Sequence, residues 1–117
     1  MHEVSIAEGI VSAVEQSVPE GTPVLSVRVA VGELAGVDVE ALLFAWESVR
    51  KGTAMQRAAL VIERPPGKAW CMQCAKDVPL HRHGDACPFC GGYQLLPTQG
   101  HELQVLDVEI PDDSSSA

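Results

Sequence analysis

The sequence predicts an α+β protein in which a small three-stranded sheet accompanies two helices and a cysteine-rich module is inserted between the last two strands. Two segments repeat apolar residues at helical spacing, and three others have the apolar pattern of strands. All four cysteines fall between the second and third predicted strands. A chain of 117 residues can form one modest domain with an appended module.

The first helix is predicted to begin near Ser5. Ser5 and Glu8 have the S-x-x-E spacing of a capping box, and apolar residues then recur with helical period as far as Val18. Pro19 and the glycine and proline that follow it end the helix. Residues 1–3 are therefore expected to form a short free arm at the positive end of the helix.

The next segments predict a strand, a helix and a second strand. Residues 24–32 alternate apolar and small or polar side chains, and residues 58–65 do the same. Between them Asp38 stands where the N-cap of a helix belongs, and Gly52 follows a basic last turn. A helix between two strands is the pattern of a βαβ crossover.

Residues 101–111 predict the third strand. Their apolar pattern changes phase between Val105 and Leu106, which predicts a bulge or burial on both faces. If the second and third strands pair antiparallel, the module between them is the tip of one long hairpin. Residues 112–117 are polar and low in complexity, so we expect a disordered tail.

The cysteines follow the pattern C-x2-C, twelve residues, C-x2-C. Each C-x2-C step places two thiolates at adjacent corners of a tetrahedron, so the pattern predicts a zinc ribbon over residues 67–97 beside an α/β domain of residues 1–66 and 98–111. Gly91 is expected to take a positive φ in a tight knuckle. Two disulfides, an iron–sulfur cluster or a thioredoxin-like redox pair are the alternatives. Disulfides require an oxidising compartment, and the chain start lacks the pattern of a signal peptide. The four ligands are Cys71, Cys74, Cys87 and Cys90.

Composition narrows the function classes. Sixteen acidic and eight basic residues leave a net charge of −8, which disfavours nucleic acid as a partner. No apolar run is long enough to cross a bilayer, so we expect a cytoplasmic protein without a membrane partner. No motif for a phosphate loop, a metalloprotease or an activated serine occurs, and all cysteines are assigned to metal, so we expect no enzyme.

The amino terminus is a second candidate metal site. An α-amino group, two amide nitrogens and the imidazole of a second residue can surround Ni(II) or Cu(II) in one plane. Here these groups are the Met1 amine, the amides of His2 and Glu3, and the His2 imidazole. A histidine in this position is also common without any ligand role, so the residues alone leave both interpretations open.

Several segments together resemble one known family. They are MHEVSIA, VxVAVGELAGV, LLFAWESVRKGT, CMQC, CPFCGG and TQGHELQVLDVEI. In this order, from Met1 to about Ile110, they are similar to the HypA/HybF family of nickel metallochaperones for [NiFe]-hydrogenase maturation. The resemblance implies a structural zinc at the four cysteines and a nickel site at the MHE start.

In that site the resemblance makes His2 the essential nickel ligand, assisted by the Met1 amine and by the amide or carboxylate of Glu3. Three further residues are candidate nickel ligands: Asp38, His81 and His83. Each also has a structural interpretation, because Asp38 can be a helix N-cap and the two histidines can lie in an exposed loop. The resemblance assigns no role to His101.

The resemblance also implies two partners, a nickel-binding GTPase and the hydrogenase large subunit, and some relatives serve urease. The chain is expected to be a monomer or a homodimer. The alternative hypothesis is a zinc-ribbon adaptor that binds another protein and has no nickel role. Loss of nickel binding when His2 is replaced would favour the metallochaperone, and unchanged nickel binding would favour the adaptor.

Overall fold

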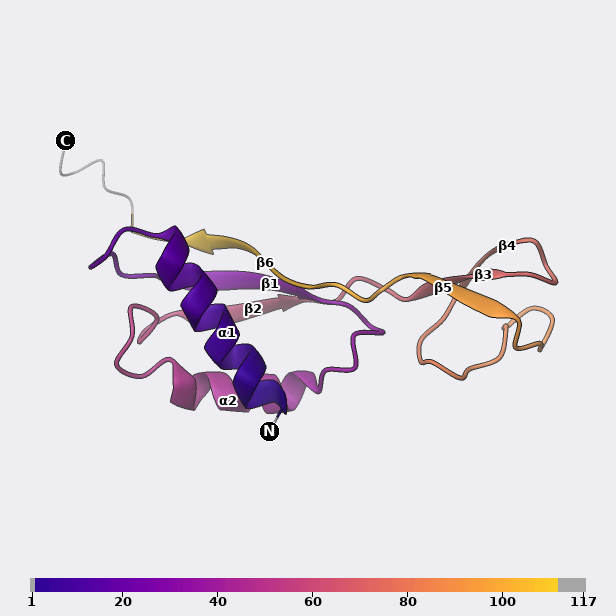
Figure 1. Cartoon of the computed structure of the whole chain (residues 1–117), viewed down its shortest axis with the longest axis horizontal. Helices are drawn as coiled ribbons and strands as arrows, with labels where there is room; N and C mark the ends of the chain where they lie inside the picture. The colour runs from indigo at the N-terminus through magenta and orange to yellow at the C-terminus, as the bar shows by residue number, and fades with distance from the viewer. Residues whose placement is uncertain (1, 112–117) are drawn as a thin grey trace. The chain divides into compact units, whose positions relative to one another are not determined.

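The computed structural model describes residues 2–111. It contains two helices and two small three-stranded sheets, with strand orders β2-β1-β6 and β4-β3-β5 (Figure 1). This architecture confirms the predicted α+β class. The elements are α1 His2–Ser17, β1 Ser26–Val31, α2 Val39–Val49, β2 Ala59–Glu63, β3 Lys68–Cys71, β4 Lys76–Pro79, β5 Leu95–Gln99 and β6 Leu103–Glu109.

The chain forms two compact units. The helical unit comprises the described residues up to Val29, Val37–Ile62 and those from Val105 on, and the ribbon unit comprises Ala30–Gly36 and Glu63–Gln104. The functional domains of residues 1–66 with 98–111 and residues 67–97 stay a prediction. The tail predicted at residues 112–117 lies outside the described residues.

β1 is the central strand of the first sheet. Backbone bonds from Leu25 N to Glu109 O and from Gly32 N to Glu102 O, both 2.7 Å, join opposite ends of β1 and β6, so these strands are antiparallel. On the other side, Ala59 N donates to Leu25 O at 3.1 Å where β1 and β2 both begin, and their arrows run the same way in Figure 1.

The conditional prediction of one long hairpin is therefore wrong, because β2 and β6 lie on opposite sides of β1. The crossover through α2 brings β2 parallel to β1, which leaves β6 the other edge. The prediction that β6 is buried on both faces is also wrong. As an edge strand it keeps only Val105 and Val108 half-buried, while Leu103 and Leu106 are exposed.

α1 begins at His2 instead of near Ser5. Ser5 is exposed within the helix, so it does not act as the cap. Glu3 explains the earlier start: it is an acidic residue in the first turn, where the helix dipole favours it, and its carboxylate is held by the backbone of Asp38. The expected free arm is thus wrong for His2 and Glu3. Further along, α1 buries the predicted residues Ala7, Ile10, Val11 and Val14.

α2 has the predicted N-cap, but it ends at Val49 with Arg50 as its C-cap, so the predicted basic last turn is wrong. The Asp38 side chain accepts from Ala41 N at 3.1 Å, and beyond the helix Gly52 has φ +74°. Trp46 is almost completely buried, and its Nε1 donates to Ala58 O at 2.9 Å, which ties the helix to the start of β2. Neither described helix is long and apolar enough to span a membrane.

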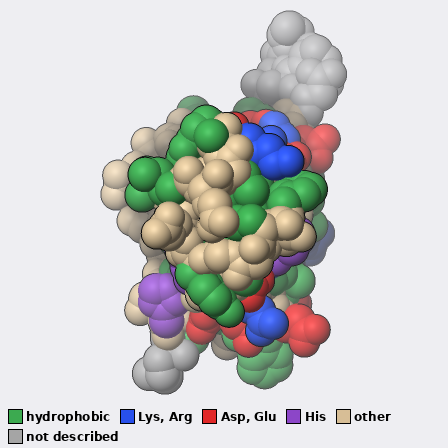
Figure 2. All heavy atoms as spheres, turned by 90° about the vertical axis from the view of Figure 1, so that its right-hand side faces the viewer, with side chains coloured by type: hydrophobic (Ala, Val, Ile, Leu, Met, Phe, Trp, Pro, Cys, Tyr) green, Lys and Arg blue, Asp and Glu red, His purple; other side chains and the backbone are tan. Residues whose placement is uncertain are grey.

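The ribbon unit has a small core of its own. In its sheet, β3 pairs antiparallel with both β4 and β5. Large hydrophobic side chains remain exposed on it, and green atoms are frequent on the face shown in Figure 2. So few buried side chains rarely stabilise a fold without a metal or a disulfide. The buried residues are Leu34, Ala69, Cys71, Val78, Leu80 and Cys87.

Candidate metal centres

The four predicted cysteines meet in the ribbon unit. Their sulfur atoms all lie within 4.8 Å of one another, with 3.7 Å between those of Cys71 and Cys90 and 3.9 Å between those of Cys74 and Cys87. A tetrahedral zinc ion with Zn–S bonds of ~2.3 Å holds its sulfurs ~3.8 Å apart. These sulfur–sulfur distances exceed the ~2.05 Å bond length of a disulfide, so all four cysteines are free thiols. The cluster therefore fits a metal ion such as zinc.

Two equivalent turns present the sulfurs. Ala75 N donates to Cys71 O at 2.7 Å, and Gly91 N donates to Cys87 O at 2.9 Å. Each turn places a residue at positive φ, 56° at Ala75 and 73° at Gly91, and the second value confirms the predicted conformation of Gly91. Within the turns Cys74 N and Phe89 N point at the sulfurs of the preceding cysteines, at 3.3 and 3.4 Å.

The electrostatics of the cluster require a cation for full ionisation. Burial, together with hydrogen bonds that the Cys74 thiol donates to the neighbouring sulfurs, raises the pKa of Cys74 to about 12. Burial, the largest single influence, opposes ionisation of Cys87. Hydrogen bonds from the backbone N–H groups of Cys90 and Phe89 and from the thiols of Cys90 and Cys71 together outweigh it and lower the pKa of Cys87 to about 6. One thiolate thus forms readily, and a divalent ion stabilises the others.

At the amino terminus, two of the predicted nickel ligands lie together. The Glu3 carboxylate accepts a hydrogen bond from Asp38 N at 3.1 Å, and this bond lowers the pKa of Glu3. Asp38 in turn caps α2. His2 is exposed in the first turn of α1, and Met1 lies outside the described residues.

The two candidate histidines of the ribbon unit have different partners. His81 Nδ1 lies 2.8 Å from a Glu33 oxygen, while the other Glu33 oxygen accepts from Gly67 N at 2.9 Å. The Gly67 amide and then His81 lower the pKa of Glu33. His83 faces His101, with 3.3 Å between their Nε2 atoms. No pattern in the sequence indicated this pair, because only the fold brings the two residues together.

A family model described as hydrogenase/urease nickel incorporation, metallochaperone, HypA, matches residues 1–110. The chain belongs to the HypA family. Among curated HypA proteins, the hydrogenase maturation factor of Polaromonas naphthalenivorans (strain CJ2) is 47% identical over 115 residues, covering 97% of this chain and 100% of that protein. The factor of Azoarcus sp. (strain BH72) is 48% identical over 114 residues, with coverage of 96% and 100%.

Solved HypA structures share the fold. A solution structure of HypA protein has a TM-score of 0.65 at 24% identity, covering 95% of this chain and 97% of that one. The solution structure of the Ni metallochaperone HypA from Helicobacter pylori has a TM-score of 0.62 at 21% identity, with coverage of 92% and 96%. The fold class is therefore that of HypA.

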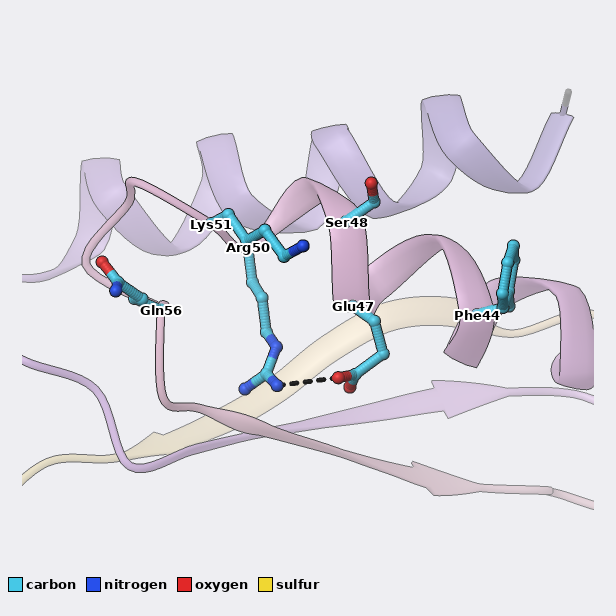
Figure 3. Close-up of a pocket in the computed structure, with 6 residues that line it drawn as sticks. All are labelled: Phe44, Glu47, Ser48, Arg50, Lys51 and Gln56. Carbon is cyan, nitrogen blue, oxygen red and sulfur yellow. Dashed lines mark hydrogen bonds and ion pairs between the residues drawn. The ribbon is translucent and has the colours of Figure 1, made fainter.

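A surface pocket lies at the end of α2. Among the described residues, its lining has no cluster of metal-ligating side chains like that of the four cysteines. Its charged groups include an ion pair of 2.8 Å between Arg50 and Glu47 (Figure 3). The pocket is lined by Phe44, Glu47, Ser48, Arg50, Lys51 and Gln56.

Proposed function

We propose that this chain binds Ni(II) at its amino terminus and delivers it for [NiFe]-hydrogenase maturation. The supporting observation is the match to the nickel-incorporation family, which begins at residue 1 and so includes the MHE start. The proposed ligands are the imidazole of His2, the α-amino group of Met1 and the amide nitrogens of His2 and Glu3.

The helical start suits this chemistry. The first N–H groups of a helix have no carbonyl acceptor within it. A metal ion can therefore replace the amide protons of His2 and Glu3, which pass to water, without breaking the helical hydrogen bonds of α1. The bond between Glu3 and Asp38 holds this turn in place. Ni(II) accepts a planar field of nitrogen ligands, whereas zinc does not favour it.

The cysteine cluster is proposed to keep a structural zinc ion. Four sulfur ligands close a tetrahedral site, so its ion does not exchange readily. A site of one imidazole and main-chain nitrogens stays open on one side, where a partner can replace the ligands one at a time. The chain would thus act as a carrier and not as an enzyme.

The proposed partners are a nickel-binding GTPase and the hydrogenase large subunit, and the family description extends the proposal to urease. Four free thiols are compatible with the reducing cytoplasm, where we place this activity. As additional nickel ligands, Asp38, His81 and His83 stay predictions, since each already has a partner in the fold.

A nickel titration of untagged, zinc-loaded protein tests the proposal. The visible spectrum should show planar Ni(II) at one ion per chain, and His2→Ala should lose most of the nickel affinity while keeping its zinc. One extra residue before Met1 should weaken the site or change its spectrum. Equal nickel binding by wild type and His2→Ala would instead support the zinc-ribbon adaptor.

A further inference from the structure

Two exposed histidines of the ribbon unit form a pair: His101, which has no assigned role, and His83, which was predicted only as an additional nickel ligand. The Nε2 atoms of His83 and His101 lie 3.3 Å apart, and their ring centroids are separated by 5.2 Å with a tilt of 32°. Both side chains reach solvent. The two nitrogens are thus close together and accessible from solvent.

The backbone on each side of His101 is fixed. Gly100 O accepts from Leu34 N and Glu102 O accepts from Gly32 N, both at 2.7 Å. Gly100 itself has φ +107°, and a Cβ there would lie 2.6 Å from the Gly67 Cα. His101 therefore projects from a segment whose position is set by close backbone packing.

The loop that carries His83 is also anchored. Leu80 N donates to Gly67 O at 3.0 Å, and Asp85 N donates to Arg82 O at 3.1 Å, which closes a turn around His83. The neighbouring His81 is held by the Glu33 carboxylate. Both members of the pair are thus presented from restrained backbone, and this lowers the entropy cost of binding an ion.

The spacing suits metal coordination. Two imidazole nitrogens bound at ~2.0–2.1 Å to one tetrahedral ion lie ~3.3–3.4 Å apart. The same contact also meets the distance of a hydrogen bond in which one ring donates and the other accepts. Imidazole is a ligand for divalent ions of intermediate softness, including zinc, nickel and copper.

We propose that His83 and His101 form a second metal site, which binds a divalent transition-metal ion through both Nε2 atoms, with water completing the coordination. The site lies wholly within the ribbon unit and uses neither the cysteines nor His2. Binding requires both Nε2 atoms to be unprotonated, so a neutral ring carries its proton on Nδ1 in the bound form.

The test uses full-length, zinc-loaded His2→Ala protein, in which the amino-terminal site is disabled. Calorimetric titration with Zn(II), and separately with Ni(II), should detect one further ion per chain. His83→Gln or His101→Gln should weaken this binding by roughly tenfold or more, because a two-point attachment becomes single. His81→Gln, made in the same His2→Ala protein, is the matched control, and its affinity for the further ion should equal that of His2→Ala alone.

Side-chain nitrogen NMR with Zn(II) supplies an independent readout. Both Nε2 signals should shift as Nδ1 becomes the protonated nitrogen, while that of His81 should not. Far-UV circular dichroism and tightly held zinc should be unchanged in every variant. Equal affinity across the three glutamine variants, or unshifted Nε2 signals, would overturn the proposal. The proposed nickel function fails by a different result, equal binding by wild type and His2→Ala.

Discussion

The carboxylate of Glu3 accepts a hydrogen bond from the backbone N–H of Asp38 at 3.1 Å, so α1 completes the N-cap of α2. In a capping box that acceptor comes from the third residue of the same helix. Here the third residue is Ala41, whose methyl group cannot accept a hydrogen bond. Glu3 replaces it from 35 residues away and thereby holds the turn that contains His2.

Removing this acceptor should destabilise the helical unit. Glu3→Ala leaves the Asp38 N–H without its side-chain partner, so thermal unfolding followed by circular dichroism should begin at a lower temperature than in wild type. Glu3→Gln keeps an uncharged oxygen acceptor, so its unfolding temperature should fall less than that of Glu3→Ala. Identical melting of the alanine and glutamine variants would show that the hydrogen bond contributes nothing.

The same contact predicts a pH dependence. The Asp38 N–H holds the pKa of Glu3 below its usual value of 4.5. Because folding lowers this pKa, the ionised carboxylate stabilises the folded state above the usual value, and the contribution is lost as the pH falls through the folded value. In urea unfolding, the advantage of wild type over Glu3→Gln should therefore shrink below pH 4.5. A difference that stays constant with pH would contradict this prediction.

Metal removal should affect the two compact units differently. Cys71 and Cys87 belong to the small core of the ribbon unit, so a zinc chelator should abolish the dispersed amide NMR signals of β3, β4 and β5. The signal of α1 and α2 at the helical circular dichroism minimum should persist, because their core is formed by other residues such as Val14 and Trp46. Cys71→Ser should reproduce the chelator effect. Loss of both signals together would count against this prediction.

The two cysteine turns allow a matched pair of substitutions. Ala75 has φ +56°, a conformation that costs a residue with a Cβ ~1–2 kcal/mol, so Ala75→Gly should stabilise the zinc-loaded protein by up to ~1 kcal/mol. Gly91→Ala introduces the same strain in open space and should destabilise it by ~1 kcal/mol. Denaturant unfolding measures the change in unfolding free energy for both variants. The change should be positive for Ala75→Gly and negative for Gly91→Ala.

A second pair tests close backbone packing. A Cβ at Gly32 would lie 2.0 Å from Gly100 O, so Gly32→Ala must displace the segment that carries His101 and should cost at least ~2 kcal/mol. Gly9 lies within α1 with nothing near its Cβ position, so Gly9→Ala should stabilise the protein by ~0.5–1 kcal/mol. Equal effects in denaturant unfolding would contradict the packing argument.

The sequence by itself determined the two helices, the strands β1, β2 and β6, and the grouping of the four cysteines, but it did not indicate β3, β4 and β5. Val14 and Trp46 could be assigned to the core because helical periodicity is a property of neighbouring residues. The four cysteines could be grouped because a C-x2-C step limits how far apart two thiols can lie. The Asp38 cap and the positive φ of Gly91 were predictable for the same local reason.

Only the tertiary structure decided the start of α1, the position of β6 and the pairing of His83 with His101. The start of α1 depends on a bond between residues 35 apart, and the histidine pair joins residues 18 apart. Contacts of this kind form when separate elements pack, and no local pattern of side chains encodes them. For that reason the apparent capping box at Ser5 gave the wrong helix start.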